Sequence, residues 1–472
     1  MTPATFSKAT VDKILSLSAQ AKTAGEIAHA LQLHRMEVLA VIAHQRLSPT
    51  EELSEEQEKG SDLDFHEAPH TGGITPNLSD RLKEPSRGEV APAEEDRPSG
   101  VYVGDDIEFS TPVTWDPSDS AKVQNPHLMI MGESGSGKTY ATQGLVAELA
   151  QAKIPCIVFD YGQSFEVDSL DKSFSDYCAP IEYLVGEQGL SLNPLEISPK
   201  DIKGPNQVAT RLADVFDAAF QLGDIQKKVF IDAAIRVYQK AGIHASDSKT
   251  WAKTAPNMAA FQAAIEELSS DKSYPNHKNA AGLSARLTTF FMLAAFRSEK
   301  WSWDALINHK QTRVHILQFR GLEGKTQRVL VEMLLWHLFF HLKSHGQNEL
   351  RVFCVLDEAH HLSFRETGPI NALLREARKF GLGIIFASQQ PEDFSHVAYS
   401  NSASKLIFQT SDPSLKVSKF LAGKADNFDR PEDIRDIIAG LPRGRAFLIT
   451  RNRGRVVQIA DFPKRSTLWS RV

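Results

Sequence analysis

The sequence predicts an α/β protein, in which a small all-α unit precedes a mainly parallel sheet that is covered by helices and carries a helical insertion. Three observations lead to this fold class. Short apolar runs alternate with helical patterns from residue 99 onward, as in parallel sheets whose strands are joined by helices. Consecutive helical patterns interrupt this alternation between about residues 205 and 296. In residues 1–46, apolar side chains recur at the 3.6-residue spacing of helices.

Residues 1–46 are expected to form three short helices, and the last two, Ala24–Leu31 and His34–Gln45, resemble a helix-turn-helix. A DNA-binding unit of this kind places the second helix of the pair in the major groove. Basic residues are few here, so a DNA-binding module and a protein-docking module are both open interpretations.

Residues 47–98 have few apolar side chains, and residues 51–97 hold 14 acidic and 5 basic residues. This composition predicts an acidic disordered linker.

Residues 99–472 are expected to form the core, with six strands, four helices in the insertion and a terminal hairpin. The predicted strands are Leu128–Met131, Ile154–Phe159, Val314–Phe319, Val352–Leu356, Gly383–Ala387 and Leu406–Phe408. The insertion is expected to hold helices at Val208–Phe220, Ile225–Ala241, Met258–Leu268 and Ala281–Ala295. The hairpin is expected to pair Arg445–Ile449 with Val456–Ile459 around Asn452-Arg453-Gly454.

The first predicted strand leads into a segment that fits the phosphate-binding pattern G-x-x-x-x-G-K-[ST]. Its residues are Gly132, Glu133, Ser134, Gly135, Ser136, Gly137, Lys138 and Thr139. A helical pattern follows directly, so the N-terminus of a helix would face a bound phosphate. Glycines allow the backbone N–H groups to converge on the phosphates. Lys138 is expected to neutralise the β and γ oxygens of ATP, and the Thr139 hydroxyl to bind Mg²⁺.

A second element ends the apolar strand Val352–Leu356 with two adjacent acids, Asp357 and Glu358. Two carboxylates at the end of a buried strand cost free energy of desolvation unless a cation lies beside them. The magnesium complex of ATP supplies that cation. Asp357 is expected to hold Mg²⁺ and Glu358 to act as the general base that polarises the attacking water. The alternative interpretation is a structural turn that happens to carry two acids.

Polar and basic residues around the next strand are further candidates. Gln389 follows the strand Gly383–Ala387 and is expected to sense the γ-phosphate. Arg378 lies just before that strand and is the candidate arginine finger, a residue that would reach across a subunit boundary to the nucleotide. Arg375 and Arg320 are the alternatives for this role. A solvated helix face is the competing interpretation for Arg375 and Arg378.

Together these motifs resemble the HerA and FtsK branch of the RecA-like P-loop ATPases, and HerA more closely. The resemblance runs from about Val101 to Phe462 and rests on residues 131–139, Phe159-Asp160, Leu192-Asn193-Pro194-Leu195, Leu356-Asp357-Glu358-Ala359-His360, Arg378-Lys379-Phe380-Gly381, Ser388-Gln389-Gln390-Pro391 and Leu441-Pro442-Arg443-Gly444. Two departures are visible. The family more often has Thr-Gln-Arg-Pro in place of residues 388–391, and HerA begins with a small β-barrel rather than a helical unit.

The resemblance implies an ATPase that assembles as a homo-hexameric ring, holds ATP between subunits and moves double-stranded DNA through its pore. It also implies a nuclease or other effector protein as partner, either in DNA processing or in anti-phage defence. Two other functions stay open: a soluble ATPase of the secretion or conjugation type, and a nucleotide-gated scaffold for a partner effector.

Charge and hydropathy bear on partners and location. The net charge is −6, but residues 441–472 carry eight arginines and lysines against one acid, a candidate contact for a polyanion. Arg443, Arg445, Arg451, Arg453 and Arg455 are expected either at the nucleotide interface or at the pore. No run approaches the roughly 18 apolar residues of a membrane span, and no secretory signal pattern begins the chain. A cytoplasmic location without membrane attachment is therefore expected.

Overall fold

The computed structural model describes residues 8–19, 27, 30–31, 100–119, 123–189, 192–292, 302–346, 349–362, 368–390, 393–412 and 415–469. The chain divides into two compact units, Met1–Arg97 and Pro98–Val472. In the first unit the structure describes the helix α1 (Lys8–Ala19). Most of the expected helix-turn-helix, and the expected linker at residues 47–98, lie outside the described residues.

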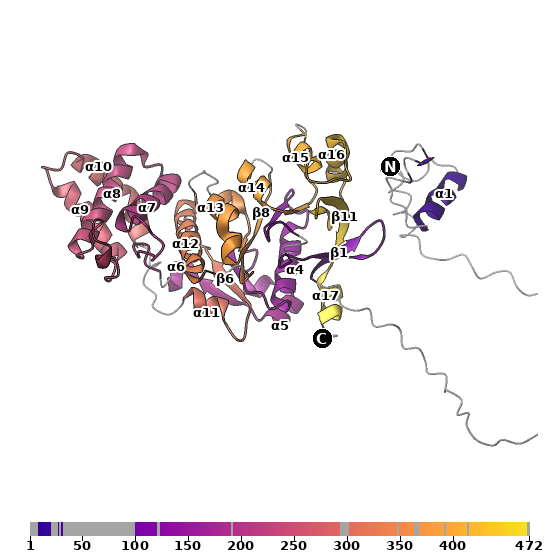
Figure 1. Cartoon of the computed structure of the whole chain (residues 1–472), viewed down its shortest axis with the longest axis horizontal. Coiled ribbons are helices and arrows are strands. Elements are labelled where there is room, and N and C mark those ends of the chain that lie inside the picture. Colours follow the sequence, from indigo (N-terminus) through magenta and orange to yellow (C-terminus); the bar gives the residue numbers. More distant parts are fainter. Residues whose placement is uncertain are drawn as a thin grey trace, which may run out of the picture. The chain divides into compact units, whose positions relative to one another are not determined.

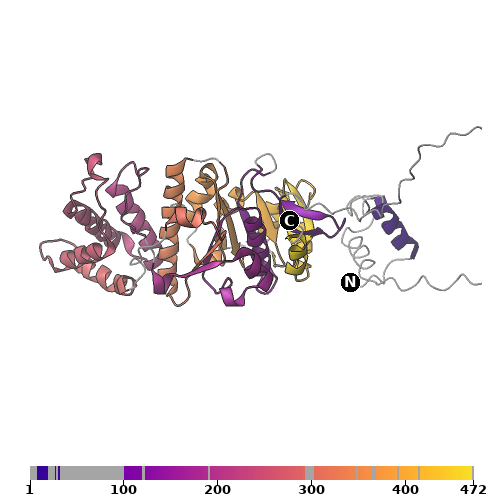
Figure 2. The same ribbon diagram turned by 90° about the horizontal axis from the view of Figure 1, so that it is seen from below.

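The second unit is built on one sheet of eleven strands among the described residues (Figures 1 and 2). The strands are β1 (Val101–Asp106), β2 (Pro112–Trp115), β3 (Leu128–Met131), β4 (Cys156–Asp160), β5 (Ile181–Leu184), β6 (Val314–Gln318), β7 (Val352–Leu356), β8 (Leu382–Ser388), β9 (Ser404–Ile407), β10 (Arg445–Thr450) and β11 (Arg453–Ile459). Their order across the sheet is β2-β1-β11-β10-β9-β3-β8-β7-β4-β6-β5. The predicted α/β class and all six predicted strands are confirmed, with ends that differ by at most two residues.

The seven strands from β9 to β5 are parallel, and the remaining four are antiparallel additions at one side. β3, β4, β6, β7, β8 and β9 are buried along their whole length. Strands that are covered on both faces favour apolar side chains on both faces, and all but β9, in which Ser404 and Lys405 are buried, are mostly apolar runs. Because the central strands are parallel, their carboxyl ends share one edge of the sheet.

The terminal hairpin differs from the prediction in the position of its turn. Arg453 and Gly454 lie inside β11, and the turn consists of Arg451 and Asn452, whose φ angles are 49° and 57°. Two consecutive positive φ angles match the right-handed twist of a two-residue hairpin. Gly454 instead makes room for an aromatic side chain, because a Cβ there would lie 2.5 Å from the ring of Phe447.

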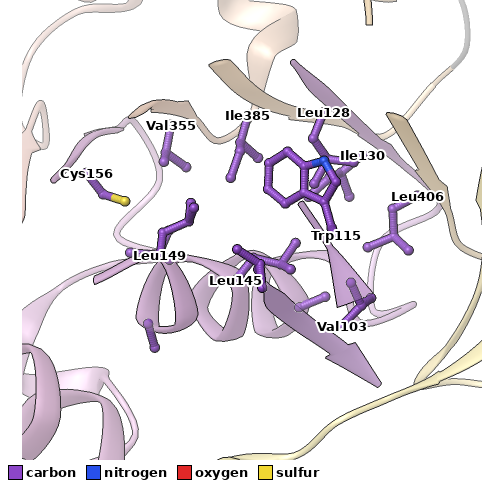
Figure 3. Packing of buried hydrophobic residues seen from close by; sticks show 14 of the residues in the cluster. Val103, Trp115, Leu128, Ile130, Leu145, Leu149, Cys156, Val355, Ile385 and Leu406 are labelled. Atoms are coloured by element: carbon purple, nitrogen blue, oxygen red, sulfur yellow. The ribbon is translucent and has the colours of Figure 1, made fainter. Parts of the chain in front are cut away.

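One face of the sheet packs against α4 (Lys138–Gln151), α5 (Lys172–Cys178) and the C-terminal helix α17 (Phe462–Trp469). Figure 3 shows Leu145 and Leu149 of α4 beneath strand residues such as Val355 and Ile385, with Trp115 beside them. The indole of Trp115 meets the ring of Phe353 edge to face at 5.5 Å. This apolar layer fixes α4 against the sheet, and α4 carries the phosphate-binding segment.

Alternate strand residues point to the opposite face, where the aromatic ring of Phe386 packs on Phe394, and Phe394 packs on Tyr399. The helices α12 (Gly324–His345), α13 (Pro369–Glu376) and α14 (His396–Asn401) pack together in sequence on this side. Shorter helical segments complete the core: α6 (Val185–Gln188), α11 (Trp303–Ile307), α15 (Lys416–Ala422), α16 (Pro431–Ala439), and the 3₁₀ turns η1 (Val167–Ser169), η2 (Ser248–Thr250), η4 (Ala359–His361) and η5 (Ala377–Phe380). Among the described residues, no helix is both long enough and apolar enough to cross a bilayer.

The four helices expected in the insertion are present as α7 (Pro205–Phe220), α8 (Gly223–Lys240), α9 (Met258–Ser270) and α10 (His277–Met292) (Figures 1 and 2). Phenylalanines form a core of their own here. The ring of Phe216 lies 4.9 Å from those of Phe230 and Phe290. α7 joins this bundle to the sheet unit through α12, where the Arg211 guanidinium stacks 4.3 Å from the ring of Phe340.

Candidate active site

The phosphate-binding segment lies at the carboxyl end of β3, which neighbours β8 and β9 in the sheet. Gly132, Gly135 and Gly137 have φ angles of 155°, 76° and 111°, and the last two are values that favour glycine. A Cβ on Gly132 would lie 2.5 Å from the Cβ of Phe408. Helix α4 begins directly afterwards at Lys138, so the first backbone N–H groups of the helix point toward the loop.

Lys138 is enclosed by this loop, with 6% of its surface exposed. Its Nζ donates a hydrogen bond to the carbonyl oxygen of Glu133 at 3.0 Å, and the Ser136 hydroxyl donates to the same oxygen at 2.7 Å. Burial lowers the pKa of Lys138, while the nearby carboxylates of Glu358 and Asp357 act in the opposite direction. The arrangement holds a desolvated ammonium group beside backbone donors, as an anion site requires. Thr139 is part-exposed on the first turn of α4.

Asp357 follows β7 and is 2% exposed. Its Oδ1 accepts the backbone N–H of Glu358 at 3.1 Å, whereas its Oδ2 is buried without a hydrogen-bond partner in the described part of the chain. The pKa of Asp357 is raised to about 6, mainly by burial and also by the charges of Glu358 and Asp160, while the Ser164 hydroxyl acts in the opposite direction. Burying a carboxylate that has one oxygen without a hydrogen bond costs folding free energy. A cation beside Asp357 would offset the desolvated charge and would also bind the free oxygen.

Glu358 is held by one side chain from beyond the neighbouring strand β8 and by one from the turn η4 that follows Glu358. The amide nitrogen Nε2 of Gln389, just beyond β8, lies 3.2 and 3.3 Å from the two carboxylate oxygens of Glu358. His360 Nδ1 lies 3.2 Å from Glu358 Oε2. The backbone of Glu358 is left-handed, with φ 54°, a conformation that non-glycine residues adopt at a cost and that clusters at functional sites. The structure therefore brings Lys138, Asp357, Glu358 and Gln389 to one edge of the sheet.

Asp160 is a site residue to which the sequence assigned no role. It ends β4 and accepts the backbone N–H groups of Gly162, Ser164 and Phe165 at 3.2, 3.1 and 2.9 Å. Gln318, at the end of β6, donates its Nε2 to Asp160 at 2.8 Å. These bonds fix the loop after β4 beside Asp357. An acid ending a fully apolar strand is the signal that could have indicated this residue.

The turn before β10, which holds the motif Leu441-Pro442-Arg443-Gly444, also reaches the phosphate loop. The Gly444 backbone N–H donates to the carbonyl oxygen of Ser136 at 3.4 Å. Arg443 and Arg445 flank this glycine and therefore lie at the phosphate-loop edge. Arg451 lies at the other end of the hairpin, where it pairs with Asp116 at 3.2 Å. Because β10 runs antiparallel to β9, Arg443 and Arg445 lie at the edge of the sheet that holds the phosphate loop, and Arg451 lies at the opposite edge.

Arg378 lies at the opposite edge of the sheet from the phosphate loop, because η5 precedes the start of β8 while the loop follows the end of β3. Its guanidinium donates to the carbonyl oxygen of Gln124, just before β3. Arg375, Arg378 and Lys379 line a cavity of about 920 Å³ there. Arg320 is at the site edge, paired with Glu166. Within one chain, Arg378 is thus separated from the other predicted site residues.

Comparison with known sequences finds similarity to HerA helicases. Residues 117–338 match the family model described as the central domain of the helicase HerA. The curated DNA double-strand break repair helicase HerA of Sulfurisphaera tokodaii is 21% identical over 365 residues, which cover 74% of this chain and 66% of the relative. HerA of Saccharolobus solfataricus is 20% identical over 345 residues, covering 71% and 62%. The chain therefore spans just under two thirds of the length of these relatives.

Solved structures give the same fold. VirB4 of Thermoanaerobacter pseudethanolicus superposes with a TM-score of 0.59 at 17% identity, covering 77% of this chain and 96% of that one. The bacterial conjugative coupling protein TrwB superposes with a TM-score of 0.50 at 12% identity, covering 77% and 90%. The resemblance to HerA/FtsK-type P-loop ATPases is thereby confirmed, and so is the RecA-like fold.

Proposed function

We propose that this HerA-type P-loop protein hydrolyses ATP as its magnesium complex and uses the energy to translocate double-stranded DNA. The observation that carries the ATPase proposal is that the buried Lys138 lies within the electrostatic range of Glu358 and Asp357, while Asp357 Oδ2 has no hydrogen-bond partner among the described residues. A phosphate would satisfy the ammonium group, and a divalent cation would satisfy the carboxylate. The residues present therefore fit a nucleotide with Mg²⁺.

Each side chain has a defined task in this proposal. The loop from Gly132 to Thr139 binds the phosphates through backbone N–H groups, and Lys138 neutralises charge on the β and γ oxygens. Thr139 and Asp357 would hold Mg²⁺, which neutralises negative charge on the phosphates when bound. Glu358 accepts the proton of the attacking water as general base.

Gln389 and His360 position the base. Their bonds at 3.2 to 3.3 Å engage both carboxylate oxygens of Glu358, so the side chain cannot rotate freely. We propose that Gln389 exchanges this contact for the γ-phosphate when ATP is bound. Glu358 is then released toward the water, which links nucleotide sensing to base activation.

Arg378 enters as a residue supplied by the neighbouring subunit of a homo-hexameric ring. Its position at the far edge of the sheet excludes it from its own site and leaves it available to a second copy of the chain. An arginine finger contributes on the order of 10³ to 10⁵ in rate. Single alanine substitutions at Arg378, Arg375 and Arg320 should show one large loss of ATP turnover and two small ones. A large loss at Arg320 alone would assign the role within the chain and overturn the proposal for Arg378.

The DNA-motor proposal rests on the sequence relatives, which are named as DNA repair helicases, and is tested by ATP turnover with and without long double-stranded DNA. We expect stimulation that weakens as salt rises, because phosphate contacts are screened. Absence of stimulation at every salt concentration would reject it.

A nuclease or other effector partner, in DNA processing or anti-phage defence, completes the proposal. In the scaffold alternative, Glu358→Gln locked on ATP would still activate the partner, whereas a motor would not.

A further inference from the structure

A cluster of histidine and aspartate side chains lies outside the nucleotide site, where α11 meets the end of α12. His337, His341 and His345 are spaced four residues apart and so line one face of α12. Asp304 comes from α11. A ring nitrogen of His341, a ring nitrogen of His345 and a carboxylate oxygen of Asp304 all lie within 4.8 Å of one another. Within the described ranges, these three residues form a group with the donor set of a metal site.

His337 has partners of its own and stands apart from this group. Its Nδ1 accepts the indole N–H of Trp303 at 2.7 Å, and its Nε2 lies 3.7 Å from Glu196 Oε2. Both ring nitrogens are therefore directed to protein groups. Of the three histidines on this face of α12, His337 therefore contacts other protein groups, whereas His341 and His345 lie near Asp304.

The two remaining histidines present basic nitrogens. His341 Nε2 is buried and faces Asp304 Oδ1 at 3.3 Å, and among the described residues it makes no well-aligned hydrogen bond. His345 Nδ1 lies 2.8 Å from the carbonyl oxygen of His341. A carbonyl only accepts hydrogen bonds, so this Nδ1 carries the proton and Nε2 keeps its lone pair. A backbone carbonyl that fixes the tautomer of a histidine is a recurring feature around metal ligands.

We propose that His341, His345 and Asp304 bind a first-row transition-metal ion of the Zn²⁺ type. Two imidazoles and one carboxylate suit Zn²⁺, which takes nitrogen ligands at about 2.0–2.1 Å and carboxylate oxygens at about 2.0–2.2 Å. Ring nitrogens do not suit Mg²⁺, which prefers oxygen. The site therefore selects a different metal from the one proposed for the nucleotide. Small rotations of the three side chains would bring their ligand atoms to metal-binding distance, and a water molecule would complete the coordination of the ion.

The place of the site in the fold indicates a structural task. β6 ends at the nucleotide edge, α12 runs back from there, and His345 closes α12 ahead of the start of β7. The cluster is thus at the opposite edge from the phosphate loop. Asp304 lies on the short helix that links the chain after the insertion to β6. A bound ion would fasten α11 to α12 and so fix the segment by which the insertion returns to the sheet.

The test is a calorimetric titration with ZnCl₂ of the full-length, untagged chain from which metal has been removed with a chelator. Excess Mg²⁺ is present throughout, so that it saturates the carboxylates of the nucleotide site. We expect one Zn²⁺ per chain. His345→Ala and Asp304→Asn should each weaken binding by about 10-fold to 100-fold or more. Both side chains are largely exposed, so these variants should fold. His337→Gln is the matched control on the same helix face and should bind as the unmodified chain does.

Two further readouts separate a site from adventitious binding, and neither needs nucleotide. Zn²⁺ should raise the thermal unfolding midpoint by on the order of 2–4 °C, and this shift should vanish in His345→Ala. Co²⁺ should give the visible absorption of a four-coordinate site in the unmodified chain but not in Asp304→Asn. Equal Zn²⁺ affinity in all variants, or no saturable binding, would overturn the proposal and leave the ATPase proposal untouched.

Discussion

Replacing Asp357 with asparagine should stabilise the nucleotide-free protein at neutral pH while removing the contribution of Mg²⁺ to nucleotide binding. The side chain is 2% exposed, and burial raises its pKa to about 6, against about 3.9 in an unfolded chain. Folding thus places a carboxylate where its ionised form is disfavoured. Asparagine keeps the shape and one acceptor oxygen and removes the charge.

The size of the effect follows from the two pKa values. A difference of about two units, at about 1.4 kcal/mol per unit, makes the ionised carboxylate cost on the order of 3 kcal/mol of folding free energy. The folded state holds the proton to higher pH than the unfolded state does. The contribution of the protonated Asp357 carboxyl to the free energy of unfolding is therefore fully present below about pH 4 and is lost as the pH rises through about 6. The gain from Asp357→Asn should be complete above about pH 6 and disappear below about pH 4.

The assay is thermal unfolding of both proteins from acidic to neutral pH, without and with a non-hydrolysable ATP analogue and Mg²⁺. Without nucleotide, the variant should have the higher midpoint at neutral pH. With nucleotide and Mg²⁺ the order should reverse, because only the native carboxylate gains a cation. A nucleotide-free variant less stable than the native chain at neutral pH would refute the claim that Asp357 is held in an unfavourable ionised state.

Four other substitutions test the remaining assignments. Lys138→Ala should abolish nucleotide binding in a fluorescence titration, because the buried ammonium group is the cation of the phosphate loop. Glu358→Gln should keep binding and lower ATP turnover by about 10² to 10⁴; turnover near the native rate would make the base assignment wrong. Gln389→Ala should keep binding and lower turnover less, since it removes the proposed contact to the γ-phosphate but leaves the base Glu358 in place. Arg465→Met should destabilise the protein by about 3–5 kcal/mol in chemical denaturation, because it removes the cation paired at 3.1 Å with Glu148, a carboxylate that is 1% exposed; an unchanged midpoint would contradict this.

The fold class was predictable because the central strands are covered on both faces. Burial on both faces favours apolar side chains at most positions, and the apolar runs in β3, β4, β6, β7, β8 and β9 stand out in the sequence for that reason. β1, β2 and β5 were not predicted as strands. β5 is half-exposed along its length, and β1 contains a glycine and two acids. Their strand character comes from pairing with neighbours, which local sequence does not encode.

The sequence by itself determined the phosphate loop and the acid pair, since Gly132–Thr139 and Asp357-Glu358 are contiguous and each follows a buried strand. Strand order and direction were decided only by the tertiary structure. Parallel pairing put Gln389 and Asp160 at the same edge as Lys138, although they are far apart along the chain. It also put Arg378 at the other edge. The physical reason is that a sheet brings together the ends of strands whose neighbours are chosen by long-range hydrogen bonding and packing, and no local pattern records that choice.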